Sequence, residues 1–91
     1  MRIDIEVELS ERVAPGNRVE TRRFSREVEM ELPSVGAEIE LNVAAEPVLV
    51  TVAKIIREEN STPCVIVKGG SLTFKSLRED ERWSEKLITA V

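Results

Sequence analysis

Residues 27–41 alternate between apolar and acidic side chains, and this pattern constrains the fold more than any other in the chain. Val28 and Met30 occupy one phase before a Pro-Ser-Val-Gly break, and Ile39 and Leu41 continue the alternation after it. A period of two residues is typical of a half-buried β-strand, with the apolar side toward a core and the glutamates toward water. The chain is therefore expected to be mainly β.

The same reasoning predicts the remaining strands. Strands are expected over residues 2–9, 22–32, 37–43, 48–57, 64–68 and 72–75, with turns at 33–36 and 69–70. Residues 10–21, centred on Ala14-Pro15-Gly16-Asn17, form either a mobile loop or a hairpin with arms at 11–14 and 18–22. Residues 48–57 are apolar on both faces, which is typical of a strand that is covered twice or bends within a closed sheet.

The C-terminal residues show a helical pattern instead. Ser76 and Glu79 match the spacing of a capping box. Trp83, Leu87 and Val91 recur at helical spacing and would share one face. These features predict an α-helix over about residues 77–90, with Trp83 buried against the sheet.

The length of 91 residues indicates a single domain over 1–91. The strand and helix patterns together predict a small, partly open β-barrel or strongly bent sheet of about five to six strands with one C-terminal α-helix. The order strand, Leu-Pro-Ser-Val-Gly, strand, strand between Val28 and Ile56 also resembles small SH3-like β-barrel proteins of bacterial and phage genomes. That resemblance implies a barrel of five or six short strands and no catalytic residue, because such proteins have diverse or unknown roles.

The composition argues against enzymatic chemistry. The chain has no His and no Tyr, which removes the commonest general acid or base and the commonest transition-metal ligand. Cys64 is the only cysteine, so no internal disulfide can form, and its place before Val-Ile-Val indicates a small strand hydrophobe. We expect no enzymatic activity, no metal and no cofactor. No run of about 18 apolar residues is present, so we expect no membrane span and a cytoplasmic location.

Carboxylates form one candidate set of functional residues. Eight of them occupy the polar phase of the alternating strands: Asp4, Glu6, Glu8, Glu27, Glu29, Glu31, Glu38 and Glu40. Such groups could act as a general acid and base or bind a hard cation. Their shared phase favours the simpler interpretation, a solvated face of the sheet.

Arginines form the second candidate set, and they are the expected ligand- or partner-binding residues: Arg18, Arg22, Arg23 and Arg26. A guanidinium cluster can bind phosphate or carboxylate through paired hydrogen bonds. Alternatively, these arginines pair with glutamates of neighbouring strands. In a strand, Arg22 and Arg26 would share a face and Arg23 would lie on the other.

The function expected from these observations is a non-enzymatic protein-interaction module with an unidentified protein partner, or a homodimer. Small β domains with unpaired edges can accept an added strand without special side chains. The alternative is a nucleic-acid or anion-binding protein that uses the arginine cluster. Nucleic acid is the less favoured partner, because the net charge is −4 and phosphate binding depends on an excess of Lys and Arg.

Overall fold

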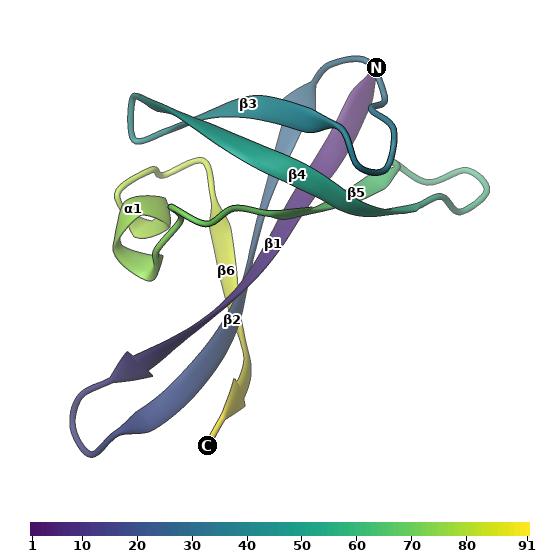
Figure 1. The fold of residues 1–91 in the computed structure, drawn as a ribbon. Helices are drawn as coiled ribbons and strands as arrows, with labels where there is room; N and C mark the ends of the chain where they lie inside the picture. Colours follow the sequence, from purple (N-terminus) through teal and green to yellow (C-terminus); the bar gives the residue numbers. More distant parts are fainter.

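The computed structural model describes all 91 residues, which form one strongly twisted sheet and one short helix (Figure 1). The elements are β1 (Arg2–Val13), β2 (Arg18–Glu29), β3 (Glu38–Val43), β4 (Glu46–Ile56), β5 (Cys64–Lys68), α1 (Phe74–Arg78) and β6 (Ser84–Ala90). The strand order is β3-β4-β5-β1-β2-β6; β1 and β5 are parallel and every other pair is antiparallel. The mainly β class is confirmed. Because β3 and β6 each keep an unpaired edge, the sheet is not closed into a barrel.

β1 and β2 form one long hairpin, so the hairpin alternative for residues 10–21 is correct. Its register runs without interruption from Arg2↔Glu29 to Val13↔Arg18. β5 pairs with β1 only over Asp4–Glu6, near one end of this hairpin. The far half of the hairpin, together with β6, therefore projects from the body as a three-stranded arm (Figure 1, lower part).

The core lies between the near half of the hairpin, the β3–β4–β5 part of the sheet and α1. Fourteen apolar side chains form one buried cluster. Phe24 of β2 packs against Phe74 of α1, with ring centroids 5.8 Å apart. In β4, Val50 and Val52 are buried whereas Leu49 is largely exposed, so the alternative of a strand covered on both faces is wrong. A register shift between Val52 and Lys54 makes the strand irregular, and Ile55 packs against the core beyond it.

The predicted C-terminal helix over 77–90 and the predicted strand over 72–75 are both wrong. The helix is only Phe74–Arg78, and residues 84–90 form β6. The capping box uses Thr73 and Ser76: the Thr73 hydroxyl accepts from Ser76 N–H, and the Ser76 hydroxyl accepts from Thr73 N–H. Gly69-Gly70 consequently leads into a helix and is not a hairpin turn.

The physical reason for the early helix end lies at Asp80. Its carboxylate accepts a hydrogen bond from the main-chain N–H of Arg82, and its carbonyl accepts from Trp83 N–H. These bonds close a turn that competes with helix continuation. Trp83 is buried as predicted, but it is carried by this turn and does not lie on a helix. Leu87 is 46% exposed because it lies in the edge strand β6, and Val91, directly after that strand, is 86% exposed.

The turn before β3 depends on Gly36, whose φ is +89°. Gly36 N–H donates to the Val52 carbonyl at 2.8 Å, so this conformation also aligns the chain with β4. We expect Gly36→Val to lower the free energy of unfolding by about 1–2 kcal/mol, because a side chain disfavours positive φ. Gly70→Val is the control, since neither glycine has an atom within 4 Å of an added Cβ and only Gly36 has a positive φ. Equal denaturation midpoints for the two variants would contradict the strain argument.

Candidate functional site

Three of the four predicted arginines form ion pairs within the chain. Arg18 and Arg22 both donate to Glu20, each at 2.9 Å. Arg22 also donates to Glu85 of β6 at 3.0 Å. Arg23 lies on the opposite face, as predicted, and donates to Glu8 of β1 at 2.7 Å.

These pairs join the strands of the arm to one another and to the helix. Arg78 of α1 donates to both oxygens of Glu85, at 2.8 and 3.0 Å. Hydrogen bonds from Arg78 lower the pKa of Glu85, and those from Arg22 lower the pKa of Glu20. The guanidinium groups of Arg18, Arg22 and Arg23 therefore already have carboxylate partners.

Arg26 differs from the other three because no carboxylate binds it. It takes the core phase of β2, opposite Ile5, where its guanidinium carbon lies 6.0 Å from the centre of the Trp83 ring. One terminal nitrogen donates to the Asn42 carbonyl at 3.0 Å. Burial lowers the pKa of Arg26, and the nearby charge of Arg82 lowers it further. An unpaired, partly buried cation of this kind favours a bound anion.

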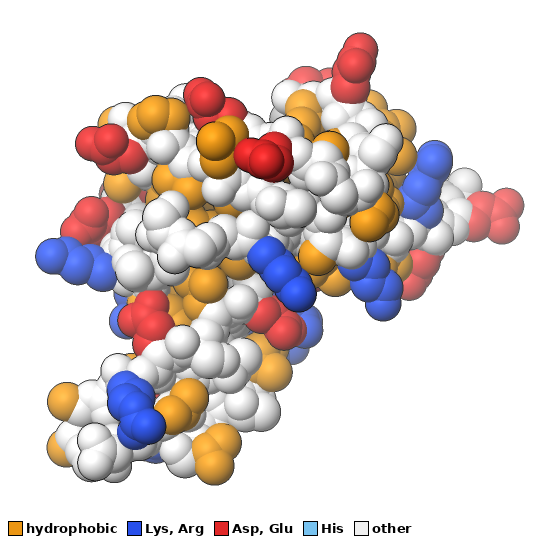
Figure 2. All heavy atoms as spheres, in the orientation of Figure 1, with side chains coloured by type: hydrophobic (Ala, Val, Ile, Leu, Met, Phe, Trp, Pro, Cys, Tyr) orange, Lys and Arg blue, Asp and Glu red, His pale blue; other side chains and the backbone are white.

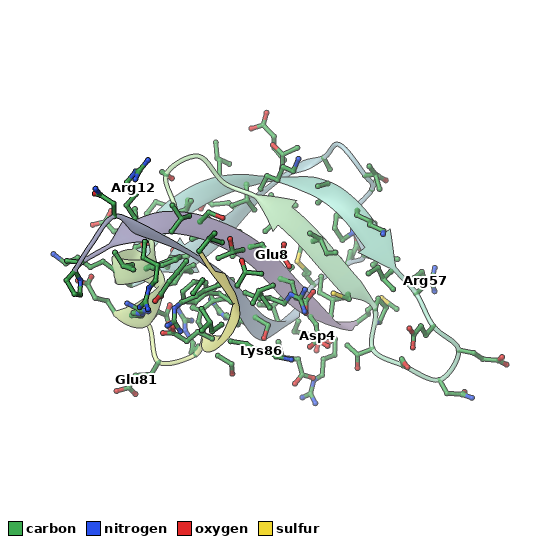
Figure 3. All side chains as sticks on the ribbon, turned by 90° about the horizontal axis from the view of Figure 1, so that it is seen from below. Asp4, Glu8, Arg12, Arg57, Glu81 and Lys86 are labelled. Atoms are coloured by element: carbon green, nitrogen blue, oxygen red, sulfur yellow. The ribbon has the colours of Figure 1, made fainter.

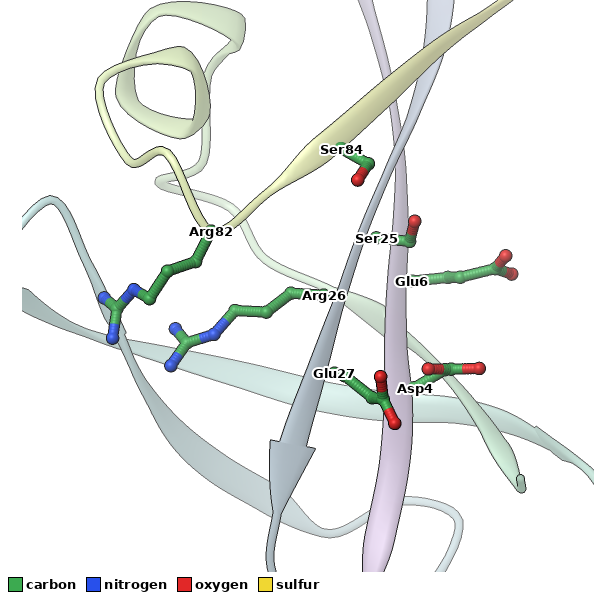
Figure 4. Close-up of a pocket in the computed structure, with 7 residues that line it drawn as sticks. All are labelled: Asp4, Glu6, Ser25, Arg26, Glu27, Arg82 and Ser84. Carbon is green, nitrogen blue, oxygen red and sulfur yellow. The ribbon is translucent and has the colours of Figure 1, made fainter.

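Arg82 brings a second guanidinium to the same place. It donates to Asp80 at 2.7 and 2.9 Å and to the same Asn42 carbonyl at 3.3 Å. Arg26 and Arg82 therefore converge from β2 and from the turn before β6, and Figure 4 shows both side chains extending to the same side of β2. The Nε of Arg26 and one terminal nitrogen of each arginine have no acceptor in the protein.

Asp80 fixes this arrangement. Its buried carboxylate accepts from the Arg82 side chain, from Arg82 N–H and from Ala44 N–H of the β3–β4 turn. The bonds from Arg82 and Ala44 hold the pKa of Asp80 far below its usual range. The turn before β6 is thus tied to the end of the β3–β4 hairpin.

We predict that acid destabilises the protein through Asp80 and through Glu20 and Glu85. Their folded-state pKa values lie below the ordinary values of 3.8 and 4.5. A carboxyl group whose pKa is lower in the folded than in the unfolded protein stabilises the fold fully at pH values above its unfolded-state pKa. This stabilisation is lost as the pH falls from the unfolded-state pKa to the folded-state pKa. Denaturation curves should therefore show little change above about pH 6 and a progressive loss of stability below about pH 4.5.

Asp80→Asn tests the share that Asp80 contributes. We expect a loss of about 1.5–3 kcal/mol at pH 7, the usual contribution of hydrogen bonds to a charged group, and a weaker pH dependence between pH 5 and pH 3. Glu81→Gln is the control, because Glu81 is exposed and forms no ion pair. An Asp80→Asn variant with the wild-type acid profile would show that another carboxylate is responsible.

Two surface pockets lie next to each other at this end of β2, and Glu27 lines both. The larger has a volume of about 360 Å³. It is lined by Ser25, Arg26 and Glu27 of β2, by Arg82 of the turn before β6, by Ser84 at the start of β6, and by Asp4 and Glu6 of β1 (Figure 4). The smaller, of about 200 Å³, is lined by Arg2, Glu27, Val28 and Glu29. Together they lie along residues 25–29 of β2, and each is also lined by residues of β1.

One edge of this end of β2 is open because β6 does not cover the whole strand. Pairing between the two strands ends at Ser25↔Ser84, and the chain before Ser84 turns away. β2 itself continues to Glu29. Its last residues, 26–29, therefore have β1 on one side and no strand on the other.

The direction of the main-chain groups follows from the hydrogen bonds. Met30 N–H donates to the Met1 carbonyl, so even-numbered residues of β2 bond to β1. Val19 exchanges both of its main-chain bonds with Val91, which shows that odd-numbered residues face the β6 side. The N–H and C=O of Glu27 and of Glu29 consequently point toward the open position and have no partner there.

The eight predicted carboxylates are distributed over β1, β2 and β3, and only Glu31 lies outside a strand. None of the eight carboxylates is buried, and Figure 3 shows Asp4 and Glu8 projecting from β1. Cys64 donates to the Glu6 carboxylate at 3.2 Å, and burial together with this bond raises the pKa of the thiol to about 12. The thiol is therefore protonated near neutral pH and is a poor nucleophile.

Sequence reasoning identified Arg26 but missed Arg82, Ser25 and Ser84. Asp80-Glu81-Arg82 was assigned to the inside of a helix, where Arg82 would have faced solvent. The useful signal was the Asp two residues before an Arg, which can close a turn through its carboxylate.

No protein-family model, curated protein or solved structure matches this chain. No helix in the structure has the length and apolar character needed to cross a membrane. No group of three or more acidic or cysteine side chains is arranged to hold a metal ion.

Proposed function

We propose that this protein is a non-enzymatic protein-interaction module that binds an extended peptide segment of a partner as an additional strand beside residues 26–29 of β2. The observation that carries the proposal is the uncovered end of this strand. The main-chain groups of Glu27 and Glu29 face a position that no strand fills, and both pockets are lined by residues of this end of β2. Strand addition uses such groups for affinity and the neighbouring side chains for specificity.

The other two open edges support the proposal less well. Neither pocket reaches β3, and neither extends along β6 beyond Ser84. A strand laid along β3 or β6 would therefore find no recess for its side chains. The end of β2 is the one edge where unpaired main-chain groups and a recess occur together.

The charge of this edge indicates what kind of strand fits. Glu27 and Glu29 are exposed on one face of β2, and Asp4 lies beside them. Like charges directly opposite one another destabilise a strand pair. Pairing between the β2 edges of two copies would oppose these glutamates, so the edge favours a different, basic or neutral partner over a homodimer.

The test is a screen of random heptapeptides against the isotopically labelled protein, with binding followed by main-chain amide shifts. The proposal predicts that peptides shift the amides of Glu27 and Glu29 and the neighbouring residues. Peptides that shift only amides of β3 or β6 would contradict it, as would the absence of any binding peptide.

Two variants of one residue separate main-chain from side-chain recognition. Glu27→Pro removes the outward N–H without breaking a bond to β1, and proline is tolerated on an edge of this kind. Glu27→Ala removes the carboxylate and keeps the N–H. We expect Glu27→Pro to abolish peptide binding and Glu27→Ala to retain it, with similar melting temperatures for the two variants.

Nucleic-acid binding by the arginine cluster is the weaker candidate. Arg18, Arg22 and Arg23 are engaged by glutamates of the same chain. Acidic side chains are prominent over β3 and β4 in the space-filling view (Figure 2), and the net charge is −4. Only Arg26 among the four has no carboxylate partner, and one such guanidinium on an acidic protein is a poor basis for binding a phosphate backbone.

A further inference from the structure

The direction of the β2 edge leads to a more specific inference, which rests on the proposed function. β2 runs from Ser25 toward Glu29, and β6, its neighbour, runs the opposite way. A peptide that continued the line of β6 would also run antiparallel to β2. It would enter opposite Glu29 and end opposite Glu27, just before Ser84.

The end of that peptide meets the two converging arginines. Beyond Glu27 the position beside β2 is occupied by Ser84, with Arg82 just before it. An added strand therefore cannot extend past Glu27 without colliding with β6. Arg26 and Arg82 border the same pocket, and each keeps at least one terminal nitrogen without an acceptor. The hydroxyls of Ser25 and Ser84 line the pocket as well.

From this geometry we propose that the partner segment is a free protein C-terminus, whose terminal carboxylate binds Arg26 and Arg82 while its last three residues pair with Glu27 and Glu29. The last residue exchanges main-chain bonds with Glu27, and the third from last exchanges them with Glu29. One carboxylate oxygen accepts from Glu27 N–H, and the other faces the guanidinium groups. The charge of the terminus thus compensates Arg26, which has no carboxylate of its own.

Asp4, Glu6 and Glu27 line the same pocket as the two arginines. Figure 4 shows their carboxylates on the other side of β2 from the two guanidinium groups, so the terminal carboxylate is placed on the guanidinium side. Glu27 is moreover bound by Arg2 at 3.1 Å. These carboxylates instead set side-chain preferences along the peptide.

Those preferences follow from the alternation of the added strand. The last and third-from-last side chains would share the face of Glu27 and Glu29, which favours basic or hydroxyl residues. The penultimate side chain would lie beside half-buried Val28, which favours an apolar residue. The expected ligand is therefore a C-terminus of the pattern basic or hydroxyl, apolar, basic or hydroxyl.

The experiment compares two displayed libraries of random heptapeptides. In one library the last random residue is the C-terminus and has a free carboxylate. In the other library a fixed Gly-Ser tail follows the random residues, so the last random residue has no free carboxylate. Enriched peptides are then synthesised as free acids and as amides, and their binding is measured by fluorescence anisotropy. We expect enrichment from the free-terminus library, and at least tenfold weaker binding of each amide.

Variants of the protein test the arginines. Arg26→Gln and Arg82→Gln should each weaken binding of the free acid at least tenfold and leave binding of the amide unchanged. Arg23→Gln is the matched control, because Arg23 lies on the opposite face and pairs with Glu8. Melting curves verify the fold, and if a variant unfolds, the comparison of acid and amide on the native protein still decides the question.

Each unfavourable outcome has a distinct meaning. Equal binding of acids and amides would overturn the C-terminal proposal while strand addition to β2 survives. Insensitivity of the free acid to both arginine substitutions would overturn it as well. If the protein forms a dimer that the Glu27→Pro substitution dissociates, a second copy of the chain binds at this edge, and the C-terminal proposal is overturned. Failure of both libraries to yield any binding peptide would remove the proposed function itself.

Discussion

Replacing Trp83 by alanine is expected to lower the free energy of unfolding by about 3–5 kcal/mol, the usual cost of truncating a buried large aromatic side chain. Trp83 is 8% exposed and belongs to the single core cluster. It also holds the turn before β6 against the body, where the Arg26 guanidinium covers its ring. Alanine would leave a cavity under that guanidinium and loosen the start of β6.

Fluorescence and chemical denaturation measure this effect directly, because Trp83 is the only tryptophan. The native emission should lie at the short wavelengths of a buried indole and move to longer wavelengths on unfolding. Trp83→Phe is the informative control. The indole N–H is buried without an acceptor, so phenylalanine removes an unsatisfied donor while it keeps most of the packing. A native spectrum typical of an exposed indole would contradict the assignment.

The sequence predicted the strands well where one face is buried. The expected 64–68 strand matches β5, and 37–43 and 48–57 match β3 and β4 to within two residues. Alternation is reliable there because burial of one face specifies the phase. For residues 10–21 the sequence did not distinguish a mobile loop from a hairpin. This part of the β1–β2 hairpin extends beyond the core, and most of its side chains are polar, so one face is not marked by apolar residues.

The C-terminal error has a different origin. Residues 84–90 pair along β2 at the edge of the sheet, and most of their side chains are exposed. Neither face of such a strand is strongly apolar, so the apolar/polar alternation typical of a strand is weak. The chance spacing of Trp83 and Leu87 then led to the prediction of a helix. Tertiary pairing with β2 then outweighs local propensity, as is common for short segments.

The candidate site could be predicted only in part for the same reason. Arg26 was predicted as a member of the arginine cluster, but the position of Arg82 beside it depends on where β6 begins. The open end of β2 is likewise a difference in length between two strands that pair across a long sequence separation. Local patterns contain no information that β6 begins only at Ser84, so the uncovered end of β2 could not be recognised before the topology was known.

The second large effect is expected at Phe24, which is 1% exposed and lies opposite Val7 in the middle of the β1–β2 hairpin. Phe24→Ala should destabilise by about 3–5 kcal/mol. This is a large part of the total of about 5–15 kcal/mol that is usual for a domain. Denaturation at low temperature keeps the variant folded at the start of the titration. Phe24→Leu, which retains most of the volume, should lose much less.

A double-mutant cycle with Phe74 shows what the residue does beyond filling space. The two rings lie 5.8 Å apart at 46°, and Phe74 is carried by α1, whose five residues are too few for a helix to be stable alone. We expect Phe24→Ala and Phe74→Ala to be non-additive, with a coupling of about 0.5–1.5 kcal/mol. Such coupling would mean that Phe24 holds the helix, and with it the Asp80 turn, against the sheet. Additivity within experimental error would show instead that α1 is held by Leu77 and the arginine pairs, and that the turn carrying Arg82 is positioned independently of β2.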